Sequence, residues 1–499
     1  MSAIRPNARR VSDAQLILRR LRRFFDEVRE PVLHEDGESP APISPEGVSL
    51  EIRNGACILH LWSGQYNRVR RVTEVREEGR HALRLRLSAL GREERWARLE
   101  DQLGRRSVLL ETSAQDWQPE LRRMLERQWA DWRIERLTAA PDLSRSLSPS
   151  YVRGVATRGR AAWAVLGAPP DLDASQSTMA LAFGLIWLDE LRRERPEMAV
   201  RGLRLVLPAA RAAATAQRLP WLRRDRAGVE LLVYDDAGSV HKAEPADSGA
   251  LTSEPPVCRP LAEPHEPAAG WLAAVVAATG AECAPRTDGR LAVSIAGMPF
   301  AYVAGGEMTY GLERQQPMSA ADVEAVVALG LELRSVRRAG SRDREHPLYR
   351  LGPERWLESQ VRRYIQRLDP NVRPAPVYSQ ASAKLGLEHG AADLLACDRD
   401  GRLILLELKT AEDLGAPLQL LDYWLRVERA RERGELEARG YFPGVRLRET
   451  PARLALAAPA VHFHPKTDLL ASFFSPGIDF ELIGLNADWR AGLKVLFRR

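Results

Sequence analysis

One apolar run near the end of the chain restricts its fold more than any other feature. Residues 402–409 read Arg-Leu-Ile-Leu-Leu-Glu-Leu-Lys, so five of the six positions from 403 to 408 are leucine or isoleucine. A strand with one face in water alternates apolar and polar side chains, whereas a strand buried on both faces is apolar almost throughout. The run therefore predicts an inner strand of a sheet covered by helices, which is typical of α/β domains.

The run forms the second strand of a predicted hairpin. Asp393–Cys397 is the first strand, and residues 398–401 end in Asp-Gly, which is a strong hairpin signal between two apolar runs. We expect Asp393 to lie opposite Leu406, or opposite Glu407 if one residue bulges out of the ladder. In both cases the carboxylates of Asp393 and Glu407 come together at the end of an apolar hairpin.

The predicted hairpin ends in two carboxylates and a lysine, which are costly to bury unless they are paired or bind a metal. Lys409 shares a face with Glu407 because side chains alternate along a strand. Mg²⁺ takes oxygen ligands and is usually held by one or two carboxylates together with substrate phosphate. The cluster therefore predicts a site for Mg²⁺, or for Mn²⁺, at which Lys409 orients or helps to deprotonate a metal-bound water for the hydrolysis of a phosphodiester.

These residues resemble the core of the PD-(D/E)XK nuclease superfamily, whose members have the restriction-endonuclease-like fold. Asp393, the hairpin and Glu407-Leu408-Lys409 match the D…(D/E)xK pattern, and the surrounding sequence is most similar to NucS-like endonucleases. The resemblance covers about residues 354–426. It departs from the pattern at Ala392, where the superfamily name has proline, a position that is often relaxed.

The resemblance implies a role for each matching side chain. The implied metal ligands are Asp393, Glu407, the carbonyl of Leu408 and Glu358, which lies on the predicted helix Glu354–Ile365. The implied catalytic residues are Asp393, Glu407, Lys409, which positions the nucleophilic water, and Gln419, which braces the site from the following helix. No cofactor other than the divalent cation is implied.

Composition gives an independent reason to single out Lys409. The chain has 73 arginine and lysine residues, and only five of them are lysine. The imbalance mostly reflects a GC-rich genome that encodes arginine wherever either cation serves. A lysine retained at position 409 therefore indicates a need for a compact ammonium, which a bulky, permanently protonated guanidinium cannot replace.

Charge, cysteine usage and hydropathy narrow the class of protein. The formal net charge of +6 permits a nucleic-acid partner, for which we favour DNA over RNA, but is too small to establish one. Four widely spaced cysteines without a CxxC pair argue against a disulfide scaffold and a structural zinc site. No run approaches the roughly 18 apolar residues of a membrane span. We therefore expect a cytoplasmic protein with no membrane partner.

The texture of the sequence changes several times along its 499 residues, which predicts an α/β multidomain protein. An arginine-rich amphipathic helix is predicted at Ser12–Val28, and short strands follow it, the last at Ser107–Glu111. Strands and helices then alternate up to a Pro-, Glu- and Ser-rich segment. We expect a β-rich domain at 1–112, an α/β domain at 113–242, a linker at 243–268, a small α+β module at 269–346 and the nuclease-like domain, a mixed sheet flanked by helices, at 347–499.

The α/β domain at 113–242 resembles the C-terminal domain in the order of its predicted elements. Residues 159–167 align with 401–409, and Val165 and Gly167 then replace the glutamate and the lysine. We interpret this domain as a degenerate nuclease-like copy that cannot bind metal. The alternative is two unrelated α/β domains with similar periodicity, which a different strand order would favour.

The function that these patterns favour is a Mg²⁺-dependent phosphodiesterase acting on nucleic acid, namely a DNA endonuclease of repair or defence. The upstream domains would select the substrate, or provide a surface for a homodimer or a protein partner. One alternative is a non-catalytic nucleic-acid-binding or scaffold protein that retains the nuclease fold. Another is a defence effector whose central domain senses a ligand.

Overall fold

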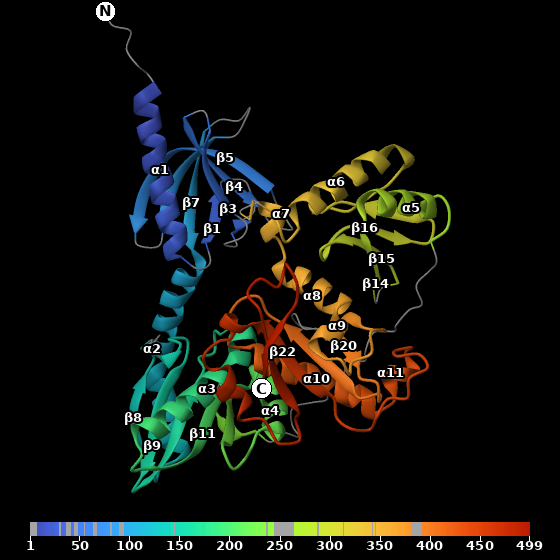
Figure 1. Ribbon diagram of the computed structural model, residues 1–499. Helices are drawn as coiled ribbons and strands as arrows, with labels where there is room; N and C mark the ends of the chain where they lie inside the picture. Colours follow the sequence, from blue (N-terminus) through green and yellow to red (C-terminus); the bar gives the residue numbers. More distant parts are fainter. Residues whose placement is uncertain are drawn as a thin grey trace, which may run out of the picture. The chain divides into compact units, whose positions relative to one another are not determined.

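The computed structural model describes residues 7–28, 31–35, 41–43, 48–53, 55–62, 67–79, 82–88, 94–140, 142, 145–172, 174–235, 238–243, 264–286, 289–312, 314–341, 343–344, 346–381 and 392–499 (Figure 1). Helices and several sheets occur along this part of the chain, so the expected α/β multidomain class is confirmed. The chain divides into two compact units: Met1–Leu109 with Ala262–Ala284 and Leu291–Pro353, and Leu110–Leu261 with Pro285–Arg290 and Glu354–Arg499. Most of the linker predicted at 243–268 lies outside the described residues.

The first unit begins with a seven-stranded antiparallel sheet in the order β2-β1-β7-β6-β5-β4-β3. One face packs on α1 (Asn7–Glu27), which begins five residues before the predicted Ser12 and buries Leu21 and Phe24. The strands are β1 (Pro31–Glu35), β2 (Ala41–Pro42), β3 (Val48–Arg53), β4 (Ala56–Trp62), β5 (Asn67–Gly79), β6 (Ala82–Ser88) and β7 (Arg95–Asp101).

A helix stands where the sequence predicted the last strand of this domain. Residues 107–111 belong to α2 (Gln102–Gln128) and not to a strand. The prediction was wrong because it considered a short apolar run in isolation. Leu110, Ala114, Trp117 and Leu121 recur at intervals of four, three and four residues, which is the spacing of one helix face.

The predicted α+β module has two helices and a small sheet in the order β14-β15-β16-β17-β18. Its elements are α5 (Ala268–Thr279), β14 (Glu282–Pro285), β15 (Leu291–Ile295), β16 (Met298–Ala304), β17 (Glu307–Tyr310), β18 (Gln316–Pro317), α6 (Val323–Val336) and the short α7 (Pro347–Arg350).

The second unit contains two six-stranded sheets, which we call the first and second repeats together with their helices. The first repeat comprises β8 (Arg133–Thr138), β9 (Val152–Arg158), β10 (Ala161–Gly167), α3 (Ala174–Glu194), β11 (Ala199–Pro208), α4 (Ala213–Arg218), β12 (Gly228–Tyr234) and β13 (Val240–Lys242). The second repeat, orange to red in Figure 1, comprises α8 (Pro353–Arg363), α9 (Ile365–Leu368), β19 (Tyr378–Ala381), β20 (Ala392–Cys397), β21 (Leu403–Leu408), α10 (Ala416–Glu432), α11 (Glu435–Ala438), β22 (Arg453–Pro459), α12 (Thr467–Ala471), β23 (Phe480–Leu485) and β24 (Val495–Arg498).

The two repeats have the same topology. In each sheet the six strands lie side by side in chain order. The second strand is antiparallel to both the first and the third. The third, fourth and fifth strands are parallel, and the sixth is antiparallel to the fifth. The crossover from the third to the fourth strand contains a long helix in both, α3 or α10. A different strand order would have contradicted the predicted relationship, and the order is the same.

Pairing between the third and fourth strands fixes which residues of the repeats correspond. Leu166 on β10 pairs with Leu205 on β11, and Glu407 on β21 pairs with Leu456 on β22. Both fourth strands end three residues later at a proline that precedes a 3₁₀ turn. Leu166 therefore corresponds to Glu407.

A hydrogen bond just beyond these strands gives the same correspondence. The amide of Lys409 donates to the carbonyl of Ala457 at 3.0 Å, and the amide of Ala168 donates to that of Val206 at 2.9 Å. Ala168 therefore corresponds to Lys409.

The alignment predicted from the sequence, with Val165 and Gly167 at these two positions, is wrong by one residue. It matched the Gly-Arg pairs of the two hairpins, whose loops differ in length. Two residues join the paired ends of β9 and β10, whereas five join those of β20 and β21. Leucine and alanine have no side-chain group that binds a metal. The same is true of the valine and glycine in the predicted alignment.

The repeats share one apolar core. Arg218 on α4 is fully buried and donates to both carboxylate oxygens of Asp422 on α10, at 2.7 and 2.6 Å. Leu222 and Phe474, each in the connection between the fourth and fifth strands of its repeat, form an antiparallel bridge. Contact between equivalent segments is the arrangement of an isologous two-fold interface.

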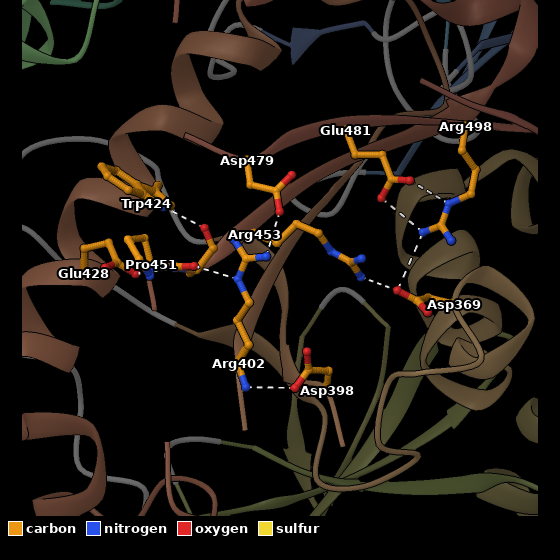
Figure 2. A network of polar contacts seen from close by, with 11 residues as sticks. Asp369, Asp398, Arg402, Trp424, Glu428, Pro451, Arg453, Asp479, Glu481 and Arg498 are labelled. Carbon is orange, nitrogen blue, oxygen red and sulfur yellow. Dashed lines mark hydrogen bonds and ion pairs between the residues drawn. The ribbon is translucent and has the colours of Figure 1, made fainter. Parts of the chain in front are cut away.

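Arginines tie the second repeat together at the amino ends of its parallel strands (Figure 2). Arg453, at the start of β22, donates to the carboxylate of Asp369, and Arg498 on β24 lies 3.7 Å from the same carboxylate. Arg402, just before β21, donates to Asp479, just before β23, at 2.7 Å. The network lies at the opposite end of β21 from the predicted metal site, so it holds the sheet in register without contacting that site.

Asp369→Asn is predicted to destabilise the protein and to weaken the dependence of its stability on acid. Burial alone would raise the pKa of Asp369, but hydrogen bonds from Arg453 and from the Asn371 amide outweigh burial and lower the pKa. A carboxyl group with a lowered pKa stabilises the fold above its unfolded pKa of about 3.9, and this contribution is lost as the pH falls through the folded pKa. The variant should lose about 1.5–3 kcal/mol at pH 7.

Urea unfolding of wild type and variant between pH 2 and pH 7 measures both effects. Asp400→Asn is the matched control, since the Asp400 side chain is 59% exposed and lies 3.5 Å from Arg448. An equal fall in stability with acid in wild type and Asp369→Asn would contradict the assignment.

Candidate functional site

The hairpin of β20 and β21 brings Asp393 to a position opposite Glu407. Leu394 pairs with Leu406, and continuing this ladder by one residue sets the two acidic residues against each other with no bulge. The expected pairing of Asp393 with Leu406 is therefore wrong by one residue, and the alternative partner is the one observed. The two carboxylates lie side by side, as both predicted registers required.

The loop of the hairpin is longer than the Asp-Gly signal alone predicts. The carboxylate of Asp398 accepts hydrogen bonds from the amides of Asp400 and Arg402 at 2.9 and 2.8 Å, which closes a five-residue connection. Gly401 has a φ of +86°, and a Cβ at this position would lie 2.2 Å from the carbonyl oxygen of Arg446. Only glycine fits there, so the turn chemistry fixes the register that pairs the acids.

Glu407 is buried and Asp393 is partly buried. Oδ2 of Asp393 accepts a hydrogen bond from the amide of Leu408 at 2.7 Å. Glu407 is 4% exposed, and its Oε1 lies 3.1 Å from Nζ of Lys409. Its Oε2 is buried with no hydrogen-bond partner among the described residues. A buried acceptor without a hydrogen bond lowers stability, and a positively charged ligand at this oxygen would remove that cost.

Burial disfavours the ionised form of both carboxyl groups. Burial, followed by the negative charge of Glu407, raises the pKa of Asp393 well above its usual value. Burial also raises the pKa of Glu407, although the charge of Lys409 acts in the opposite direction. Like charges in a poorly hydrated site favour protonation or a bound cation.

Lys409 is held as a cation by three groups. Its Nζ lies 3.1 Å from Glu407, 3.0 Å from Asp413 and 3.4 Å from Oε1 of Gln419, to which it donates. Burial alone would lower the pKa of Lys409, but the two carboxylates outweigh burial and raise it. The ammonium is therefore a fixed donor rather than a base.

Asp413 is a member of the site that the sequence analysis missed. It lies in the loop between β21 and α10, four residues after Lys409. Its carboxylate also accepts from the amide of Gly415 at 2.8 Å, which shapes the loop that begins α10. A Cβ on Gly415 would lie 2.9 Å from Sδ of Met179, so the first repeat forms part of the wall behind this loop. The available signal was an acid in a loop four residues from the predicted lysine.

Glu358 lies near the pair without joining it in one metal-binding group. It is on α8, where burial raises its pKa and the hydroxyl of Ser379 forms a hydrogen bond with it. Its charge contributes to the raised pKa of Asp393. Within the described part of the chain, no three His, Cys, Asp or Glu side chains converge closely enough to hold a metal ion.

The residues at the end of the hairpin nevertheless suit one hard cation. Asp393 and Glu407 supply oxygen ligands of the type that Mg²⁺ and Mn²⁺ prefer, and Oε2 of Glu407 is buried with no partner among the described residues. The carbonyl of Leu408 remains a predicted ligand. The structure thus brings together Asp393, Glu407, Lys409 and Gln419 and adds Asp413.

Comparison with known proteins adds no assignment. The chain matches no protein-family model, and no curated protein matches it. None of the helices in the described ranges is long and apolar enough to cross a membrane.

Glu407→Gln is predicted to abolish stabilisation by divalent cations. A cation that binds only the folded protein at a hundredfold excess over its Kd stabilises it by about 2.7 kcal/mol. Thermal unfolding of wild type with Mg²⁺ or Mn²⁺ should therefore show a higher Tm than in EDTA, and the variant should show no difference. In EDTA the variant should unfold no earlier than wild type, because it removes one of two repelling carboxylates.

Glu412→Gln is the matched control, because this exposed residue lies in the loop after Lys409. It should keep the full rise in Tm. Equal rises in wild type and Glu407→Gln would rule out the site.

Proposed function

We propose that the chain is a metal-dependent nuclease that hydrolyses phosphodiester bonds of nucleic acid, with DNA favoured over RNA. The observation that carries the proposal is the pair formed by the partly buried carboxyl group of Asp393 and the buried one of Glu407, beside the fixed ammonium of Lys409. Together with the resemblance in sequence, the mixed sheet of the second repeat supports a restriction-endonuclease-like fold of the PD-(D/E)XK type. The first repeat would then be a copy of this fold without its chemistry.

In this proposal, Asp393 and Glu407 hold a Mg²⁺ or Mn²⁺ ion, and the Leu408 carbonyl and Glu358 are the further candidate ligands. The ion supplies positive charge that stabilises the pentavalent phosphate. Lys409 keeps its proton and donates hydrogen bonds to water or to a phosphate oxygen. Gln419 and Asp413 keep the ammonium in place; a mobile lysine would have to be ordered in each reaction cycle.

Two general features support nucleic acid as the substrate. The net charge of +6 favours a polyanion, and both members of the acid pair lie at one end of the hairpin. An endonuclease of repair or defence fits these features. The upstream domains remain candidates for selecting the substrate or for binding a second copy or another protein.

One observation favours a second candidate, a nucleic-acid-binding or scaffold protein that retains the fold without catalysis. Lys409 contacts both Glu407 and Asp413, and so offsets part of the negative charge without any metal. This candidate predicts salt-sensitive binding of DNA with no cleavage.

A cleavage assay on labelled DNA and RNA of the same sequence, with Mg²⁺, Mn²⁺ or EDTA, tests the proposal. We expect DNA cleavage with either metal and none in EDTA. Lys409→Ala should lower the rate by about a hundredfold or more, since the loss of one positioned donor has an effect of this size in other enzymes. Lys494→Ala, at an exposed lysine of the same repeat, should cleave like wild type.

Two other outcomes would count against the proposal or favour the second candidate. Cleavage that persists in EDTA, or in purified Lys409→Ala, would contradict this mechanism. Binding of DNA without cleavage under any of the metal conditions would support the scaffold candidate.

A further inference from the structure

The first repeat carries an arginine at the place of the first carboxylate. Arg153 on β9 pairs with Leu166 on β10, as Asp393 lies opposite Glu407 in the second repeat. Because Leu166 corresponds to Glu407, Arg153 corresponds to Asp393. One repeat thus has an acidic residue at this position and the other a basic residue.

Arg153 is buried but only partly satisfied. It is 8% exposed, and its Nη2 donates to the carbonyl of Ala140. Its Nη1 is buried and has no hydrogen-bond partner among the residues that the structure describes. A guanidinium is always charged and has five N–H donors, so burying it with a donor unused lowers stability unless a ligand accepts that hydrogen bond.

Arg153 lines a cavity of about 310 Å³ in the first repeat. This volume lies near the lower end of the range of small-molecule sites. Two other guanidiniums, of Arg136 and Arg145, line the same cavity, and Trp187 and Leu147 give it an apolar wall. The cavity therefore combines convergent cationic donors with a surface for an uncharged group.

The acidic residues of the cavity are engaged by the other two arginines. Arg145 forms an ion pair with Glu194 and lies 3.4 Å from the carboxylate of Asp142. Arg136 lies 3.8 Å from Glu194. Three guanidiniums thus face two carboxylates, which leaves one excess positive charge, and among the described residues Arg153 has no carboxylate within salt-bridge distance.

We propose that this cavity binds a small phosphate-bearing molecule. Nη1 of Arg153 donates to a phosphate oxygen, Arg145 borders the same anion, and the uncharged part of the ligand lies against Trp187 and Leu147. Guanidinium groups suit phosphate because their planar fork donates two parallel hydrogen bonds. The proposal concerns the first repeat alone and does not depend on nuclease activity in the second.

Isothermal titration calorimetry of the full chain in EDTA tests this site, with inorganic phosphate and adenosine 5′-monophosphate as the probes. EDTA prevents metal-mediated binding of the nucleotide in the second repeat. We expect both probes to bind, with the nucleotide at least tenfold tighter because it also reaches the apolar wall. Equal affinities would overturn the assignment of Trp187 and Leu147 to the ligand.

Arg153→Met should weaken both probes at least tenfold, since methionine keeps much of the volume and removes the donors. Arg160→Met is the matched control, because this arginine is exposed in the turn between β9 and β10. It should bind like wild type. If Arg153→Met does not fold, Arg145→Gln provides the same comparison from the more exposed side of the cavity, whose arginine is 42% exposed. Failure of wild type to bind either probe at millimolar concentration, or unchanged affinity in the folded variant, would overturn the proposal.

Discussion

The structure of the second repeat has to offset the energetic cost of placing two carboxylates at one end of an apolar hairpin. Asp393 and Glu407 face each other across β20 and β21, and burial raises the pKa of both. Hydrogen bonds from the Leu408 amide and an ion pair with Lys409 offset part of the cost, and one oxygen of Glu407 remains buried without a partner in the described part of the chain. Strands selected only for stability would have apolar residues at these positions. This cost is the observation on which the proposed cation site rests.

The two repeats show how one topology can support opposite electrostatics. They share strand order, strand direction, the crossover helix and the proline that ends the fourth strand. At the position where the second repeat has Asp393, the first has Arg153, and leucine and alanine replace the glutamate and the lysine. Function thus follows the residues placed on the fold rather than the fold itself. Helix α3 also links the two repeats. It carries Trp187, which lines the cavity, and Glu190, which accepts a hydrogen bond from Lys466 of the second repeat at 2.7 Å.

Strong local patterns made much of this predictable. The apolar run at 403–408 and the Asp-Gly turn predicted β20 and β21, and side-chain alternation then placed Glu407 and Lys409 together with Asp393. Gln419 accepts a hydrogen bond from Lys409 at 3.4 Å.

What was missed depends on long-range contacts or on loop length. Local pattern does not mark β9 as a strand, because Arg153 and Thr157 interrupt its apolar pattern although both are buried in the fold. Asp413 could not be assigned, since only the path of the loop brings it to Lys409. The correspondence of the repeats slipped by one residue because the hairpin loops differ in length, and strand pairing rather than the turn sequence fixes it.

The most direct test of the central claim is a crystal structure of the full chain soaked with Mn²⁺, with anomalous scattering measured at the manganese edge. The account predicts an anomalous peak in contact with the carboxylates of both Asp393 and Glu407, with Lys409 beside it. A structure in which these carboxylates are ordered but manganese is absent from them, or binds only elsewhere, would contradict it.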